Sequence, residues 1–258
     1  MQLAAIDDAA WSSPWRNRQV GEKAALSLGL LLTALVAPVW PGSVLVAVAS
    51  LVAMAVLARI DVRVLAAALA APTVFILVGA ASVAVGVGAA PGDAWGHLGW
   101  FWVGPSGLAQ AARLLGHGIA GTLATLLLAT TTPMVDLLTA ARRLRVPDAL
   151  IEVSSLTYRL LWVLLGTTLA VHEAQLARLG DAAGRRGLRS RMQAAGDTVG
   201  SVLVRSWDRA RRMEAGLAGR GYERSLPTLS REVGANWVFR CGAILTLSGI
   251  WGVVAWLQ

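Results

Sequence analysis

Residues 64–88 read VLAAALAAPTVFILVGAASVAVGVG and contain no Asp, Glu, Lys or Arg. A helix needs roughly 20 predominantly apolar residues to cross the hydrocarbon core of a bilayer, so this stretch is long enough to span. Further uncharged stretches lie at 24–58, 94–112, 114–135 and 241–258. Their apolar residues run continuously instead of alternating, which argues against a β-barrel. The sequence therefore predicts an all-α integral membrane protein.

The overall composition agrees with a membrane location. Of the 258 residues, 56% are hydrophobic and 15% are charged, whereas about 25% are charged in a soluble domain. Such a composition excludes a disordered chain and a nucleic-acid-binding globule. The lipid bilayer is the expected surrounding, and nucleic acid is not an expected partner.

Five membrane spans are expected. The turn Pro38–Gly42 divides the first apolar run into a hairpin of two short segments, 22–38 and 43–58. The other three predicted spans cover 64–88, 106–131 and 236–257. Residues 1–20 read as a polar tail, in which Trp11 and Trp15 either sit at the membrane interface or belong to a loosely attached terminus.

The distribution of positive charge predicts the orientation. The net charge is +8, and seventeen of the 23 basic residues lie between 140 and 240. Basic residues beside spanning helices mark the cytoplasmic face. The loop at about 89–105 has no Lys or Arg and holds Trp95, Trp100 and Trp102, which is typical of an outer interface. We therefore expect a multi-pass protein of the cell membrane with a cytoplasmic N-terminus.

The basic region is predicted to form amphipathic cytoplasmic helices. A short helix begins at Thr132-Pro133 and ends before Pro147. A second, 148–179, is expected to dip tilted into the inner leaflet, because its apolar centre follows several polar and charged residues. A third covers about 192–219 with an apolar stripe at helical spacing. This gives three regions: N-terminal spans 1–131, a cytoplasmic region 132–231, and a C-terminal span 232–258.

No catalytic or metal-binding constellation is recognisable in the sequence. Lys23 is the only lysine, so a phosphate-binding loop of the usual kind is excluded. His97, His117 and His172 fall in three separate regions of the predicted topology and cannot share one metal ion. The spans also lack the paired acidic residues of proton-coupled transporters. The chain is therefore expected to be no enzyme, to need no cofactor and to bind no metal itself.

Two predicted helices end on an arginine with a glycine one or two positions later. They read QLARLG at 175–180 and LAGRGY at 217–222, which places Arg178 and Arg220 in the last turns. An arginine in such a position either caps its helix as a solvated charge or binds a partner carboxylate through two parallel hydrogen bonds. Spacing alone leaves both interpretations open.

The basic region resembles the T component of energy-coupling-factor transporters, and most of all its cobalt-type branch, the CbiQ family. The resemblance rests on ARRLRVP at 141–147, LTYR at 156–159, SWDRA at 206–210 and GRGY at 219–222. It covers about 130–225, whereas the N-terminal spans match only in number and hydrophobicity. In that family two long cytoplasmic coupling helices each end in an Ala-Arg-Gly-type motif that docks into a groove on an ATPase subunit.

The resemblance implies two ATPase-coupling motifs in this chain. The first falls on Ala177, Arg178 and Gly180, with Leu179 inserted, and the second on Gly219, Arg220 and Gly221, with Gly219 where the family often has Ala. The implied partners are two ATP-binding-cassette ATPase subunits and a membrane substrate-capture subunit. The implied function is to couple ATP hydrolysis to uptake, with cobalt as the first expected substrate. Nickel and a vitamin such as biotin are the alternatives, and a stand-alone membrane transporter is a less favoured one.

Overall fold

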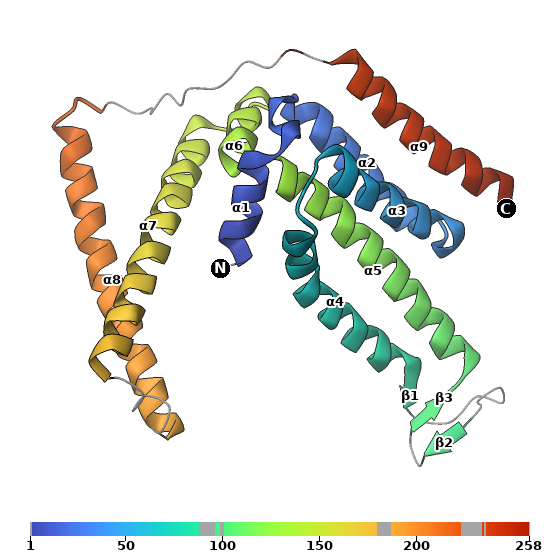
Figure 1. The fold of residues 1–258 in the computed structure, drawn as a ribbon, viewed down its shortest axis with the longest axis horizontal. Helices are drawn as coiled ribbons and strands as arrows, with labels where there is room; N and C mark the ends of the chain where they lie inside the picture. Colours follow the sequence, from blue (N-terminus) through green and yellow to red (C-terminus); the bar gives the residue numbers. More distant parts are fainter. Residues whose placement is uncertain are drawn as a thin grey trace. The chain divides into compact units, whose positions relative to one another are not determined.

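Helices account for most of the structure, which is a computed structural model describing residues 2–87, 96–98, 101–179, 187–222, 234 and 236–257. The chain divides into two compact units (Figure 1). The first unit comprises residues 1–137 and 231–258, and the second comprises residues 138–230. The prediction of an all-α membrane protein is confirmed.

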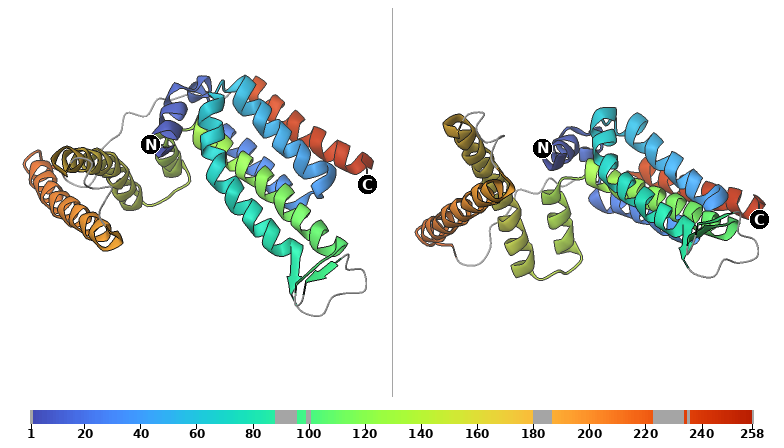
Figure 2. Two further views of the ribbon diagram at one scale, coloured as in Figure 1. Left: turned by 60° about the horizontal axis from the view of Figure 1, so that its bottom comes forward. Right: turned by 90° about the horizontal axis from the view of Figure 1, so that it is seen from below.

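The first unit is a bundle of membrane-length helices. Its helices are α1 (Gln2–Ser12), α2 (Val20–Val36), α3 (Val44–Val52), α4 (Val62–Ala84), α5 (Pro105–Thr131) and α9 (Trp237–Leu257). Short π-helical turns, Val39–Ser43 and Ala53–Leu57, extend α3 at both ends. In Figures 1 and 2 helices α2 to α5 and α9 lie alongside one another. Helix α5 contacts α2, α3 and α4 and so occupies the centre of the bundle.

Small residues on α5 allow this close packing. Ala120 and Ala124 are completely buried, and the Ala124 carbonyl accepts a 2.5 Å hydrogen bond from Ser27 of α2. A Cβ atom on Gly116 would lie 2.6 Å from Val39, and one on Gly118 would lie 3.1 Å from Ile76. The glycines of α5 therefore serve helix packing, as small residues commonly do in membranes.

A small antiparallel sheet connects α4 to α5 in the described residues. Strands β1 (Val85–Val87), β2 (Gly96–Leu98) and β3 (Phe101–Val103) are ordered β1-β3-β2. The expected helix over 64–88 is therefore too long by one turn, because the chain becomes extended after Ala84. The expected loop over 89–105 contains strands as well. Trp102 lies in β3, while Trp95 and Trp100 lie outside the described residues.

The N-terminal segment is more ordered than a polar tail. It forms α1 and the 3₁₀ turn Pro14–Asn17, whose first turn is capped by Ser13. Ala10 and Trp15 are buried, and the Trp15 ring packs edge-to-face on Phe239 of α9 with the centroids 4.9 Å apart. A loosely attached terminus is therefore wrong, because aromatic packing holds this segment against the bundle.

Five helical segments of the described residues are long and apolar enough to cross a membrane. They are Val39–Leu57, Val62–Ala84, Pro105–Thr131, Asp148–Ala174 and Trp237–Leu257. The number matches the expected five, but the set differs. Helix α2 has 17 residues and carries Glu22 and Lys23 near its start, whereas the segment Asp148–Ala174, which was expected only to dip into the membrane, qualifies by length and composition.

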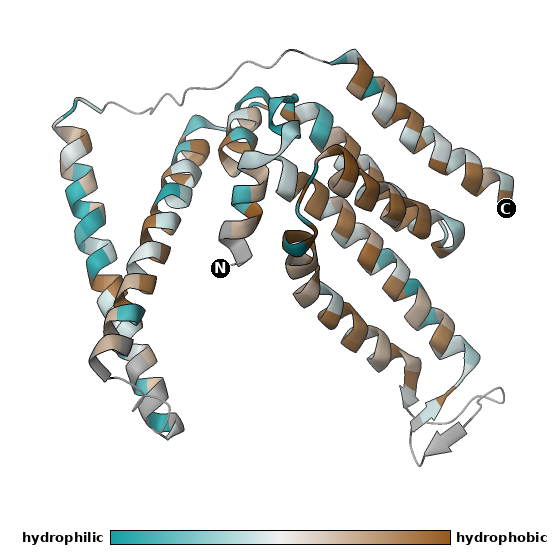
Figure 3. Ribbon diagram, in the orientation of Figure 1, coloured by the Kyte–Doolittle hydropathy of each residue, from teal (hydrophilic) through white to brown (hydrophobic). Residues whose placement is uncertain are grey.

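The second unit contains the last part of α6 (Met134–Arg143) together with α7 (Asp148–Leu179) and α8 (Leu188–Ala218). Helices α7 and α8 contact each other and run in opposite directions (Figure 1). Figure 3 shows hydrophilic residues along the length of α8, whereas α3 and α4 are almost entirely hydrophobic. Arg145, in the turn after α6, adopts a left-handed conformation with φ of 61°.

Side-chain contacts identify one end of the first unit as basic. Glu22 in α2 binds Arg240 in α9, and Lys23 in α2 donates to the Thr131 carbonyl at the end of α5. Helices α2 and α9 therefore begin where α5 ends. This basic end also carries Arg59 and Arg63, just before and within the first turn of α4. The opposite end lacks Lys and Arg throughout residues 64–112.

We expect the basic end to face the cytoplasm and the small sheet to face outward. Single cysteines replacing exposed Val62 and Ser106 in a Cys241→Ala background test this, because Cys241 is the only cysteine. An impermeant maleimide applied to intact cells should label Ser106→Cys, and should label Val62→Cys only after permeabilisation. The reverse pattern would contradict the orientation.

Candidate docking motifs and the basic end

The C-terminus of α8 forms a defined turn around Arg220. The Tyr222 amide donates to the Leu217 carbonyl at 3.1 Å, and the Gly221 amide donates to the Ala218 carbonyl at 3.1 Å. Gly221 has φ of +71°. This is a Schellman ending, in which the left-handed position favours glycine because it has no Cβ atom. Arg220 is the residue immediately before that glycine, and its side chain is exposed.

The first predicted motif is only partly described. Helix α7 continues to Leu179, so Ala177 and Arg178 belong to its last turn. Ala177 is exposed, whereas Gly180 lies outside the described residues. The expected position of Arg178 at a helix C-terminus agrees with the backbone.

Tyr222 connects the second motif to the start of α7. Its hydroxyl donates a hydrogen bond to Oε1 of Glu152, a residue 9% exposed and one turn into α7. The bonded carboxylate raises the pKa of Tyr222, and burial of the phenol adds to this effect. Tyr222 therefore remains a neutral hydrogen-bond donor at physiological pH.

The Tyr222–Glu152 contact is absent from the sequence prediction. Glu152 is one of the charged residues that precede the apolar centre of the predicted helix 148–179, and Tyr222 is only the last residue of a motif. The two residues are 70 positions apart in the chain. No periodicity or spacing joins residues at that separation, so only the antiparallel pairing of α7 with α8 brings them together.

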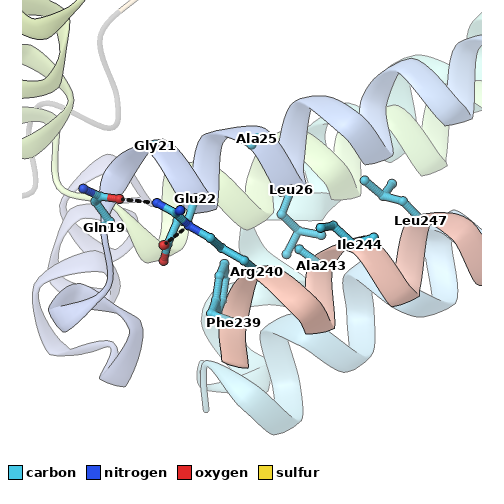
Figure 4. A pocket seen from close by; sticks show the side chains of 10 residues that line it. All are labelled: Gln19, Gly21, Glu22, Ala25, Leu26, Phe239, Arg240, Ala243, Ile244 and Leu247. Carbon is cyan, nitrogen blue, oxygen red and sulfur yellow. Dashed lines mark hydrogen bonds and ion pairs between the residues drawn. The ribbon is translucent and has the colours of Figure 1, made fainter. Parts of the chain in front are cut away.

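At the basic end, one ion pair closes a groove between α2 and α9 (Figure 4). Arg240 donates from Nε to Glu22 Oε1 at 2.7 Å, and from a terminal nitrogen to Gln19 at 3.3 Å. The backbone amide of Asn236 also donates to Glu22 Oε1, at 3.0 Å. Glu22 Oε2 is buried and has no hydrogen-bond partner among the described residues. The carboxylate thus depends on Arg240 for charge compensation.

The groove itself is apolar. Its volume is about 420 Å³, and the side chains of Leu26, Phe239, Ile244 and Leu247 line it. Figure 4 shows Glu22, Arg240 and Gln19 gathered at one end and the apolar side chains along its length. A lipid acyl chain suits such walls better than a metal ion, because the single carboxylate is already bonded to a guanidinium.

Lys23 fixes α2 to the end of α5. Its side chain is 2% exposed, and Nζ donates to the Thr131 carbonyl at 2.9 Å. That carbonyl is in the last turn of α5, where helix carbonyls lack intrahelical partners and the helix dipole favours a cation. The only lysine of the chain is therefore a structural residue rather than a phosphate ligand.

The histidines form no metal site in the part of the chain that is described. His117 Nδ1 lies 2.6 Å from the Ala34 carbonyl and 3.0 Å from Ser43 Oγ. The Ala34 carbonyl is available because Pro38, four residues later, has no amide hydrogen. His117 is thus a packing residue with a hydrogen bond. Among the described residues no group of three His, Cys, Asp or Glu side chains is placed to hold a metal ion.

Comparison with known proteins finds clear similarity. The family model for the cobalt transport protein CbiQ matches residues 12–229. The chain is 41% identical to the cobalt transport protein CbiQ of Rhodobacter capsulatus over 247 residues, which is 96% of each chain. It is 28% identical to the cobalt transport protein CbiQ of Salmonella typhimurium over 208 residues, covering 79% of this chain and 92% of that one. The similarity therefore includes the N-terminal helices as well as the basic region.

The left-handed turn at Gly221 predicts a specific sensitivity. Gly221→Ala should cost about 1–2 kcal/mol locally, because Cβ is strained at positive φ. Hydrogen exchange of the Tyr222 amide should become about 5- to 30-fold faster. The control is Gly216→Ala within α8, where a Cβ meets nothing within 4 Å and alanine favours the helix. Equal exchange rates in both variants would contradict the Schellman ending.

The ion pair at the basic end predicts a loss of stability. Arg240→Ala leaves the buried Glu22 carboxylate uncompensated and should destabilise the fold by about 3 kcal/mol. The measurement is the midpoint of thermal unfolding in detergent. Arg113→Ala, which removes an exposed arginine of α5, should leave that midpoint nearly unchanged. A similar midpoint for both variants would show that the Glu22–Arg240 pair contributes little.

Proposed function

We propose a coupling function for this chain, which belongs to the CbiQ family of cobalt transport proteins. In this proposal it is the transmembrane coupling subunit of an energy-coupling-factor uptake transporter. Two ATP-binding-cassette ATPase subunits bind its cytoplasmic side, and a separate membrane subunit captures the substrate. The chain hydrolyses nothing itself, and it transmits ATPase motion to the capture subunit.

The observation that carries this proposal is the placement of the two helix ends that bear Arg178 and Arg220. The Tyr222–Glu152 bond places the end of α8 beside the start of α7. Arg178 lies 26 positions beyond Glu152 on the same continuous helix, which at 1.5 Å per residue corresponds to about 39 Å along its axis. The two arginines therefore sit at opposite ends of one helix pair. That separation suits docking to two ATPase subunits rather than to one groove.

The chemistry of the motif supports a docking role. Arginine presents a planar fork that binds a carboxylate through two parallel bonds, which the point charge of lysine does not reproduce. Arg220 is exposed, and the turn after it is fixed by hydrogen bonds to Leu217 and Ala218. A fixed turn loses little conformational entropy when a partner binds.

The outer face of α8 supports a second contact. Val199, Leu203 and Trp207 lie one turn apart on the same face and are 68%, 67% and 66% exposed. A line of exposed apolar residues on an otherwise polar helix is typical of an interaction surface. We assign this face to the capture subunit, because a membrane-embedded partner offers an apolar surface to match it.

Cobalt is the proposed substrate, with nickel or a vitamin such as biotin as the alternative. The relatives named cobalt transport proteins support cobalt. The capture subunit supplies the metal ligands in this scheme. The protein resides in the cell membrane with a cytoplasmic N-terminus, and residues 132–231 form the cytoplasmic coupling region between the spans 1–131 and 232–258.

The proposal predicts a graded effect of the two arginines. Losing one partner of a buried charged pair costs about 2–5 kcal/mol at an interface, which is roughly 30-fold to several-thousand-fold in affinity. Arg178→Ala or Arg220→Ala alone should strongly reduce uptake while the second motif retains the ATPases. The double variant should release the ATPases from the membrane, as measured by co-purification. Arg211→Ala, which removes an exposed arginine of α8, is the matched control.

Two outcomes contradict this proposal. One is a double alanine variant, expressed at normal level, that still co-purifies with its ATPases and supports normal uptake. The other is ATP-independent transport by the chain alone in liposomes, which would instead favour a stand-alone transporter.

A further inference from the structure

Tyr222 and Glu152 join the two helices at the end opposite their connecting segment. Helices α7 and α8 are antiparallel, so residues 180–187 connect them at one end, and the Tyr222 hydroxyl binds the Glu152 carboxylate at the other. The pair is thus closed at both ends, once by the chain and once by this hydrogen bond. Breaking the bond leaves the end of α8 attached to α7 only through the contacts between the two helices.

The bond acts on a rigid turn that also carries Arg220. The Tyr222 amide is fixed to the Leu217 carbonyl, and the left-handed Gly221 sets the direction in which the chain leaves α8. Arg220 is two residues before Tyr222 in this turn. A force applied to the Arg220 side chain therefore reaches Tyr222 through a short, hydrogen-bonded stretch of backbone.

Glu152, which accepts the hydrogen bond, lies on a helix that can transmit the displacement. Glu152 is 9% exposed and lies one turn from the start of α7, a helix that runs without interruption to Leu179. A charged acceptor strengthens the hydrogen bond from a neutral phenol. The bond therefore connects the turn that carries Arg220 to the same helix that carries Arg178 at its other end.

We propose that Tyr222 and Glu152 are positioning residues that hold the turn bearing Arg220 against the first turns of α7. Their hydrogen bond transmits displacement of one docking motif to the helix of the other, so that α7 and α8 move as one lever. This inference rests on the proposed coupling function. It adds a residue pair that converts ATPase binding into a movement of the coupling helices.

The test separates coupling from assembly. In proteoliposomes that contain the chain, both ATPases and the capture subunit, Tyr222→Phe should lower substrate uptake per ATP hydrolysed about tenfold, the scale of a hydrogen bond to a charged acceptor. The ATPases should still co-purify, because Arg178 and Arg220 remain. A purely structural role would instead lower the unfolding midpoint and ATPase co-purification together, which would overturn the proposal.

Variants of the acceptor sharpen the result. Glu152→Gln keeps an oxygen that accepts the Tyr222 hydrogen bond and should retain most coupling, whereas Glu152→Leu should match Tyr222→Phe. The combination of Tyr222→Phe with Glu152→Leu should be no worse than either alone, since both remove the same bond. Glu214→Gln, at an exposed carboxylate of α8, is the control and should leave coupling intact. Additive losses of coupling in the double variant would overturn the proposal.

Failure of this inference is distinguishable from failure of the coupling function. If the unmodified complex shows no ATP-dependent uptake, the coupling function fails. If the unmodified complex is active and Tyr222→Phe couples normally, the positioning pair is wrong and the coupling function stands. In a Cys241→Ala background, Tyr222→Cys and Glu152→Cys should be joined by a short bismaleimide. No cross-link in the assembled complex with both ATPases would also overturn the proposal.

Discussion

The first unit depends on keeping charges away from the middle of its spanning helices, and most of its charges lie at the basic end. A charged side chain in the middle of a bilayer is costly. Helix α3 carries no charge, α4 carries only Arg63 in its first turn, and α5 carries only Arg113 in its N-terminal third. At the basic end, Glu22 is compensated by Arg240 and Lys23 by the final carbonyls of α5. These contacts hold the start of α2, the end of α5 and the start of α9 together. The small residues of α5 then allow the helices between the two ends to pack closely.

The second unit, unlike the first, has almost no buried core among its described residues. Its long helices have few buried residues, and α8 shows apolar side chains to its surroundings. Such a pair gains its fixed geometry from its ends rather than from a core. The Schellman turn at Gly221 and the Tyr222–Glu152 bond supply that fixation at one end. A helix pair fixed at its ends and exposed along its length suits a part that moves against partners.

The sequence predicted elements whose cause is local. Uncharged runs predicted four of the five candidate spans, Pro38–Gly42 predicted the break between α2 and α3, and the apolar period predicted α8. Contacts between residues that lie far apart in the sequence could not be predicted from it. The packing of Trp15 on Phe239, the Glu22–Arg240 pair and the Tyr222–Glu152 bond each depend on which helices become neighbours. The strands after Ala84 were missed because apolar β-branched residues such as Val85 and Val87 fit an extended strand and a membrane helix alike.

The arginine motif at the end of α8 differs from an ordinary helix cap in the contacts of the residues that follow the arginine. A solvated cap needs only an exposed end, and any flexible arginine near the last carbonyls meets that need. At the end of α8, however, Arg220 precedes the left-handed Gly221. The next residue, Tyr222, donates its hydroxyl hydrogen bond to the buried Glu152 carboxylate, 70 positions away in the chain. Helix capping alone gives no reason for that long-range bond. In the proposed coupling function a partner that pulls on Arg220 gives such a reason, because force is transmitted only through a turn whose position relative to α7 is fixed.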